Sequence, residues 1–315
     1  MKEKLREKKA IIREVAKNVI MGNRFLKGLR NKINSGRTTG ALDVDKAFKH
    51  SLSIFEHYKL GLKEAGLDDH YFEGKTLLEI GPGANLGVEL SFIGDGVAEV
   101  YALDRFTDVQ STSKEAALYE RIIAQLSEEQ RKKITGVYKT ENNLPVFIGD
   151  KINYLGNCSL EDVLAKFTDE DGGINLKVDV IVSHLALEHV ANLSKGIYSV
   201  ARLLKPGGIC IFICNLKSLG GVYKHEDEPL RLLYYSEKLW QRMFSKRGGS
   251  NRVRANGYKK QLEVNNLSVL SFNVLERMPL PELKKIKRLF DDQFKNLTNE
   301  ELSILKFRLV AQMPK

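Results

Sequence analysis

Long apolar runs and a secretory leader are missing from this sequence of 315 residues. No stretch of 18 or more apolar residues occurs, so a transmembrane helix is not expected. The amino terminus is basic and has neither an uninterrupted apolar segment nor a small-residue cleavage site, which argues against a secretory signal. Since 43% of the residues are hydrophobic, the chain can still form one large domain, or one domain with appendages.

Cysteine is scarce, with three residues that form no cluster of the kind that binds a metal: Cys158, Cys210 and Cys214. Cys210 and Cys214 alternate within an apolar run, where a strand would bury both on one face. Unpaired, buried cysteines are typical of a reducing compartment. The sequence therefore predicts a cytoplasmic protein without a bound metal.

Acidic residues are few at the amino terminus, where residues 1–40 hold twelve Lys or Arg and three Glu. Since the whole chain carries +10, the remainder is close to neutral, and no specific nucleic-acid partner is expected. Residues 1–33 predict an amphipathic helix, and residues 34–40 predict a linker. The expected apolar face consists of Ile12, Val15, Val19, Leu26 and Leu29.

The basic helix has two alternative roles. A basic, amphipathic helix is suited to peripheral contact with an anionic membrane. The same helix could instead dock on the main domain or support self-association. Docking is favoured slightly, because Gly22 and Gly28 each weaken an isolated helix by roughly 1 kcal/mol. The expected division is an arm and linker over residues 1–40 and a main domain over residues 41–315.

Apolar runs alternate with amphipathic segments along the main domain. The expected strands lie near residues 76–80, 99–103, 152–155, 178–183 and 209–214, with two more near 267–274 and 305–312. This alternation predicts an α/β fold, a Rossmann-like, doubly wound sheet of seven strands. The sheet should be mostly parallel, with an antiparallel edge strand and helices on both faces.

The turn after the first expected strand has a composition suited to binding a nucleoside. Gly81 and Gly83 allow a sharp turn and let a ligand approach the backbone. Asp104 ends the second strand, where its carboxylate could accept both hydroxyls of a ribose. Leu86 stands where a dinucleotide site needs its third glycine. Glu79 precedes the first glycine by two residues, where an acid could orient an ammonium group.

These residues resemble the first motif of class I S-adenosylmethionine-dependent methyltransferases, which reads [DE]-x-G-x-G. Three later runs, V-D-V-I-V-S, L-x-L-E-H-V and L-L-K-P-G-G, are similar to later motifs of that family. The resemblance implies S-adenosylmethionine as cofactor. The residues implied to bind it are Glu79, Gly81, Pro82, Gly83, Asp104, Arg105, Asn157, Cys158 and Ser183.

The adenine end of that site is implied at Asn157 and Cys158. Asn157 could accept a hydrogen bond from the adenine amino group, and a following backbone N–H could donate to the ring. The alternative is a plain turn from strand to helix, with Ser159 as the helix N-cap. Both interpretations are compatible with the sequence.

The segment from 229 to 258 resembles a subgroup common in bacterial polysaccharide-related gene clusters. This resemblance implies a small-molecule acceptor, a hydroxyl of a sugar or glycolipid intermediate, under a helical lid formed by residues 44–67 and 216–262. The subgroup often carries an Asp-His pair after the fifth strand, and this chain lacks it. A hydroxyl acceptor needs a base, and the candidates are His225, His184 and His189. His225 is preferred because it lies in the acceptor-side segment.

Two other functions remain open at this level. Methylation of RNA or of a nucleobase amine would be accompanied by an Asn/Asp-Pro-Pro-aromatic motif after the fourth strand. The sequence there is Ser183-His184-Leu185-Ala186, which argues against it. A protein that binds the nucleoside without catalysis is the third hypothesis, and the missing Asp-His pair supports it.

Overall fold

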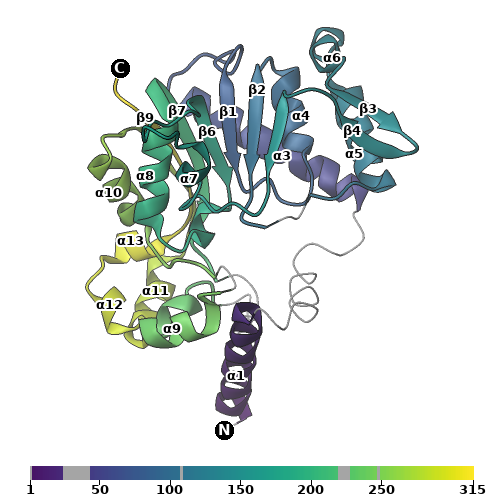
Figure 1. Ribbon diagram of the computed structural model, residues 1–315. Coiled ribbons are helices and arrows are strands. Elements are labelled where there is room, and N and C mark those ends of the chain that lie inside the picture. Colours follow the sequence, from purple (N-terminus) through teal and green to yellow (C-terminus); the bar gives the residue numbers. More distant parts are fainter. Residues whose placement is uncertain (1, 24–42, 107–108, 219–227, 247–248) are drawn as a thin grey trace.

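The computed structural model describes residues 2–23, 43–106, 109–218, 228–246 and 249–315 (Figure 1). The strands are β1 (Thr76–Ile80), β2 (Glu99–Leu103), β3 (Tyr138–Glu141), β4 (Leu144–Phe147), β5 (Ile152–Leu155), β6 (Val178–His184), β7 (Leu204–Asn215), β8 (Ser268–Arg277) and β9 (Ile304–Gln312). The longer helices are α1 (Lys2–Gly22), α3 (Val44–Glu64), α4 (Gly87–Gly94), α5 (Ser113–Gln125), α8 (Leu193–Leu203), α9 (Glu237–Phe244) and α10 (Ala255–Val264). Shorter helices are α6 (Glu128–Ile134), α7 (Leu164–Phe167), η2 (Leu187–His189), η4 (Arg231–Tyr234), α11 (Leu280–Ile286), η5 (Lys287–Leu289), α12 (Asp292–Lys295) and α13 (Asn299–Ser303).

Seven strands form one sheet in the order β5-β2-β1-β6-β7-β9-β8. The five strands from β5 to β7 are parallel, whereas β9 runs antiparallel to both of its neighbours. The predicted seven-stranded, mostly parallel Rossmann-like fold is thereby confirmed. A separate hairpin of β3 and β4 was not predicted, although its turn residues Asn142 and Asn143 both take the positive φ that such turns need.

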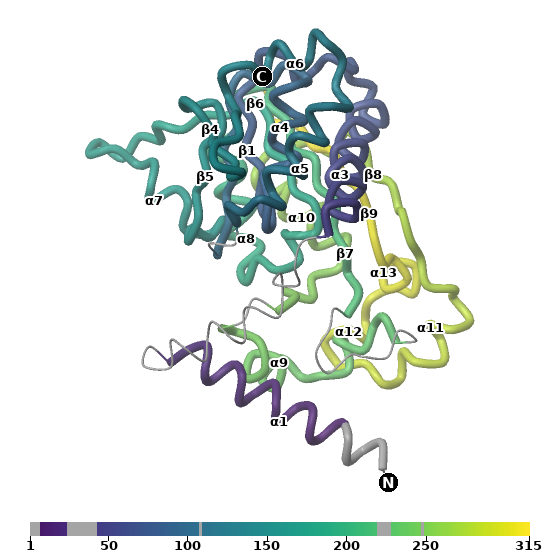
Figure 2. The backbone as a smooth tube through the Cα atoms, turned by 90° about the vertical axis from the view of Figure 1, so that its right-hand side faces the viewer, coloured from purple at the N-terminus to yellow at the C-terminus, as the bar shows by residue number. Residues whose placement is uncertain are grey.

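Helices cover both faces of the sheet (Figure 2). Residues of α3, α4 and α5 pack with Ile209, Ile211 and Ile213 of β7 in one hydrophobic cluster. The alternate β7 residues, including Cys210 and Cys214, face a second cluster that also contains residues of α8 and α10. The two cysteines are free and buried on one face, as their spacing predicts.

Helix α3 belongs to this core. It begins after Asp43, whose side chain accepts a hydrogen bond from the Lys46 N–H at 3.1 Å. Its buried residues include Phe48, Tyr58 and Leu62, which pack in the cluster on the sheet. The segment expected as the first half of a lid therefore lies against the sheet itself.

A helical cap lies beyond the carboxyl edge of the parallel strands and consists of α1, η4, α9, α11, α12 and α13 (Figure 1). Its hydrophobic cluster combines residues from 230–244, residues from 278–305 and, from α1, Ala10, Ile11 and Val15. The expected lid segment 216–262 thus contributes η4 and α9 to the cap and α10 to the sheet face. The contribution of residues 278–303 to the cap was not anticipated.

Helix α1 docks on α9 through a face that includes the predicted Val15 but otherwise consists of residues that the sequence analysis did not identify. Met21 is buried, and Asn18 is buried against the end of α9. Ile12 and Val19 are 68% and 63% exposed, so the expectation that they share one packed apolar face with Val15 is wrong. The other expected positions, Leu26 and Leu29, lie outside the described residues. Among the described helices, none combines the length and apolar character that a membrane span requires.

Candidate active site

The turn after β1 has the backbone conformation that requires glycine. Gly81 and Gly83 take φ values of 78° and 81°, in the left-handed region. A Cβ on Gly81 would lie 2.4 Å from the Cβ of Ala186, so this glycine is also needed for the close approach of the loop after β6. A Cβ on Gly83 would meet nothing within 4 Å. Gly83 therefore leaves open space beside the turn, where a ligand could approach the backbone.

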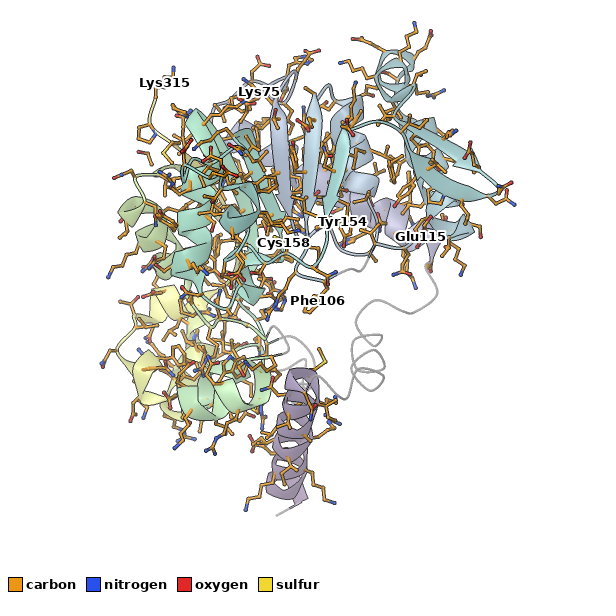
Figure 3. The ribbon with its side chains drawn as sticks, viewed as in Figure 1. Lys75, Phe106, Glu115, Tyr154, Cys158 and Lys315 are labelled. Atoms are coloured by element: carbon orange, nitrogen blue, oxygen red, sulfur yellow. The ribbon has the colours of Figure 1, made fainter. Side chains whose placement is uncertain are left out.

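Asp104 is positioned by the turn that follows β2. It is 9% exposed, and its side chain accepts a hydrogen bond from the Phe106 N–H at 2.7 Å. Its backbone carbonyl accepts one from the Cys158 N–H at 2.9 Å, which joins the loops after β2 and β5. Phe106, Tyr154 and Cys158 lie at the edge of the sheet opposite Lys75 (Figure 3). The structure thus brings the predicted ribose and adenine residues to one place.

The predicted adenine residues differ in what they expose. Asn157 is exposed and takes a positive φ of 54° in the turn after β5. Cys158 is buried in the core, and its N–H already binds Asp104. Arg105 is exposed, with its guanidinium carbon 5.7 Å from the centre of the Phe106 ring.

Glu79 is buried beneath the glycine turn beside a second carboxylate, Glu89 of α4. The Tyr58 hydroxyl donates to Glu79 Oε1 at 3.1 Å, and within the described part of the chain Glu79 Oε2 and both Glu89 oxygens have no hydrogen-bond partner. Burial raises the pKa of Glu79 to about 7 and that of Glu89 well above its ordinary value. An unpaired buried carboxylate beneath the turn fits the ammonium group of S-adenosylmethionine.

Ser183 and Pro82 are at the same edge with different exposures. The Ser183 hydroxyl is fully buried and donates to the Ile80 carbonyl at 3.1 Å, which ties β6 to β1. Its side chain is thus engaged within the sheet. Pro82, between the two glycines, is partly exposed.

His184 ends β6 and meets two histidines that the sequence analysis missed. Its ring stacks on His57 with centroids 5.7 Å apart, and His50 lies edge-on to it at 6.0 Å. His184 Nε2 is buried and has no hydrogen-bond partner in the described regions. His50 and His57 are seven residues apart on α3, so they share one helix face; that spacing was the available signal. We call His50, His57 and His184 the histidine cluster.

Burial and nearby cations keep the histidine cluster neutral. Burial, followed by the charge of Lys306 on β9, lowers the pKa of His184 to about 3. The same two causes lower the pKa of His50 and His57. The Arg308 guanidinium, which can only donate, lies 3.1 Å from His57 Nδ1, so that nitrogen must carry a lone pair.

The other two predicted bases are less informative. His189 is half-buried in η2, and its N–H donates to the Ala186 carbonyl at 2.9 Å. His225 lies outside the described residues.

Glu188, which precedes His189 in the sequence, is fully buried. Its side chain accepts a hydrogen bond from the Asn215 N–H at 3.2 Å, and burial raises its pKa to about 8. Across the described ranges, no group of His, Cys, Asp or Glu has the arrangement of a metal site.

One family model and several solved structures are similar to this chain. The family model of the methyltransferase domain matches residues 55–272. No curated protein matches the chain. Among solved structures, YcgJ from Bacillus subtilis is 16% identical over 82% of this chain and 99% of its own, with a TM-score of 0.42. The [4+2]-cyclase SpnF is 14% identical over 82% of this chain and 80% of its own, with a TM-score of 0.42.

A further structure is phosphoethanolamine N-methyltransferase 2 of Haemonchus contortus, in complex with S-adenosylmethionine. It is 14% identical over 85% of this chain and 53% of its own, with a TM-score of 0.43. The family match covers more than half of the chain, and the protein therefore belongs to the methyltransferase-domain family, whose cofactor is S-adenosylmethionine.

Proposed function

We propose that this protein transfers a methyl group from S-adenosylmethionine to a hydroxyl oxygen of a small-molecule acceptor. The observation that carries the proposal is the histidine cluster beside the glycine turn: the loop that follows His184 contacts Gly81 through Ala186. When bound, the cofactor supplies an electrophilic methyl group, and the protein's main task is to align the acceptor with it. A hydroxyl acceptor also needs a proton acceptor at that place.

The cofactor site would be formed by the loops after β1, β2 and β5. Glu79 would face the ammonium group, Asp104 the ribose, and Asn157 the adenine, while Gly83 leaves the backbone open to the ligand. Arg105 and Pro82 would contribute surface. Cys158 would support the site by joining the loops after β2 and β5, and Ser183 would support it by tying β6 to β1.

His184 is the proposed proton acceptor, in place of His225 as first choice. Its Nε2 has no partner among the described residues, and the ring is neutral at physiological pH. A pKa of about 3 makes His184 a weak base, so the proposed proton transfer requires that this pKa rise when the acceptor binds. His189 and His225 remain the alternatives. The likeness of residues 229–258 to the polysaccharide-related subgroup supports a sugar or glycolipid acceptor, and the three free, buried cysteines support a cytoplasmic location.

Turnover with labelled S-adenosylmethionine tests the proposal against lipid-linked sugars, small phenols and RNA. We expect methylation of a hydroxyl compound, and His184→Gln should reduce turnover about 10²–10⁴-fold while leaving cofactor binding intact. His70→Gln, at an exposed site that the proposal does not use, serves as the matched control. Methylation of RNA alone, or cofactor binding without turnover of any acceptor in such a panel, would contradict the proposal.

A further inference from the structure

Lys306 of β9 is a half-buried cation without a counter-charge of its own. Considering only the described residues, the Lys306 ammonium has neither a hydrogen bond nor an ion pair, although Glu276 and Glu188 act on it from a distance. The neighbouring cations are already paired: Lys217 binds Glu276 at 2.7 Å, and Arg308 binds Glu64 through two nitrogens, one of them at 2.7 Å. Lys306 is thus the cation that remains available to a ligand.

The sheet register places Lys306 beside the histidine cluster. Lys306 pairs with Asn215 and Arg308 pairs with Ile213, which in turn is opposite His184. Residues two apart on a strand share a face, so Lys306 and Arg308 both face α3, as the contact of Arg308 with His57 shows. Lys306 consequently lies close enough to influence the charge state of all three histidines.

We propose that Lys306 and the histidine cluster form an anion subsite, which binds a carboxylate or phosphate group of the methyl acceptor. The charges that face it come from five places: Glu64 on α3, Glu188 in η2, Lys217 after β7, Glu276 on β8 and Arg308 on β9, with Lys217 and Glu276 as a pair. Glu64 and Glu276 are neutralised by Arg308 and Lys217. Burial raises the pKa of Glu188 to about 8, so Glu188 is mostly protonated at physiological pH and the net charge facing a ligand is positive. His50 is exposed, so the subsite is open to solvent on that side.

The subsite links acceptor recognition to proton transfer. Burial is the main reason that the imidazoles are neutral, and repulsion by the charge of Lys306 is the second. An anion beside Lys306 cancels that repulsion, which makes His184 a stronger base when the acceptor is in place. Recognition of the acceptor as the ligand rests on the proposed methyl transfer, whereas the anion subsite itself does not.

Histidine NMR tests the subsite without measuring activity. Protein labelled at histidine is titrated with inorganic phosphate and, separately, with acetate, while chloride keeps the ionic strength constant. We expect saturable changes in the NMR chemical shifts of His50, His57 and His184, together with raised pKa values of these three residues. The chemical shifts of exposed His70 should not change. A response to phosphate assigns a phosphorylated acceptor, and a response to acetate alone assigns a carboxylate.

The matched variants are Lys306→Gln, Lys306→Arg and Lys151→Gln, the last removing an exposed lysine at the opposite edge of the sheet. Lys306→Gln should weaken anion binding at least tenfold and raise the histidine pKa values without any anion. Lys306→Arg should restore binding, and Lys151→Gln should behave as the unaltered protein. No saturable response, or an undiminished one in a folded Lys306→Gln, would overturn the inference.

Cofactor calorimetry on the same samples separates the two proposals. Cofactor binding without an anion response defeats the subsite and leaves methyl transfer in place. An anion response without cofactor binding defeats the proposed methyl transfer and leaves the anion subsite in place.

Discussion

At the scale of single residues, two glycines of the same turn serve different purposes. Gly81→Ala should cost about 1–2 kcal/mol for the left-handed backbone and roughly 1–3 kcal/mol more for its contact with Ala186. Gly83→Ala should cost only the backbone contribution but weaken cofactor binding, because its Cβ enters the open space beside the turn. Urea unfolding and calorimetry distinguish the two effects. Equal losses of stability would show that the Gly81 contact with Ala186 relaxes freely.

Asp104→Asn is the sharpest substitution at the ribose position. The amide oxygen can still accept from the Phe106 N–H, so the turn should keep its stability. Loss of the charge should weaken S-adenosylhomocysteine binding by about 10–100-fold, since hydrogen bonds to charged groups are stronger than neutral ones. Calorimetry measures the affinity, and thermal unfolding is the control. Unchanged affinity would place the ribose elsewhere.

His184 makes stability depend on pH in a known direction. Its pKa is about 3 in the folded protein against an ordinary value of 6.5, so its contribution is complete above pH 6.5 and is lost as pH falls from 6.5 toward 3. Glu79 has the opposite sign, because its raised pKa makes its contribution fade as pH rises from 4.5 to about 7. Because these two pH dependences oppose each other, the contribution of His184 is obtained by comparing the free energy of unfolding of a His184 variant with that of the unaltered protein at each pH.

The expected result is that His184→Gln flattens the loss of stability between pH 7 and pH 5, relative to the unaltered protein. His70→Gln, at an exposed site, should leave the slope unchanged. Chemical denaturation at each pH gives both slopes. Identical slopes in all three proteins would mean that His184 carries a proton when folded.

Local sequence reasoning located the cofactor residues but not the histidine cluster. Gly81, Gly83 and Asp104 stand next to the ends of strands, and their role follows from a local pattern. His50 and His57 gain significance only because β6 brings His184 beside them. Lys306 is more than 100 residues from all three histidines, so no local pattern could have paired them.

At the scale of elements, the docking of α1 on α9 depends on Asn18. Its amide group donates to the carbonyls of Gln241 and Arg242 at 3.4 and 3.1 Å, and its oxygen accepts from the Lys246 N–H at 2.8 Å. The Arg242 carbonyl is one of those that the end of a helix leaves without partners, whereas the Gln241 carbonyl also accepts from the Ser245 N–H at 3.1 Å. Asn18 thus caps α9 from another helix.

Asn18→Ala should lower the free energy of unfolding by about 1–3 kcal/mol, because buried backbone groups lose their partners. The adjacent Val19→Ala is the matched control and should change it by less than about 0.5 kcal/mol, since Val19 is exposed. Urea denaturation measures both. Similar values for the two variants would mean that α1 is not docked in solution.

The outer face of α1 is what remains for a membrane or a second copy of the chain. Exposed Ile12 and Val19 lie seven residues apart, on the same side as exposed Lys8 and Lys9.

The strands were easier to predict than helix α1, because a buried parallel strand is apolar on both faces. The face that α1 buries depends on α9, which lies more than 200 residues away.

At the scale of the whole molecule, cofactor binding should stabilise the fold by mass action. S-adenosylmethionine at 100 times its Kd should raise the free energy of unfolding by about 2.7 kcal/mol, whereas NAD should have no effect. Thermal unfolding with each ligand measures the difference. A shift with NAD and none with S-adenosylmethionine would contradict the assignment of the cofactor.

The position of β9 has a consequence for the order in which the sites arise during synthesis. β9 follows all other described strands in the chain yet lies between β7 and β8, so that side of the sheet stays incomplete until it inserts. The turns after β1, β2 and β5 are translated much earlier, whereas Lys306 and Arg308 arrive with β9. We therefore expect a nascent chain to become competent for the cofactor before it can recognise an acceptor, which would prevent methylation by incomplete polypeptides on the ribosome.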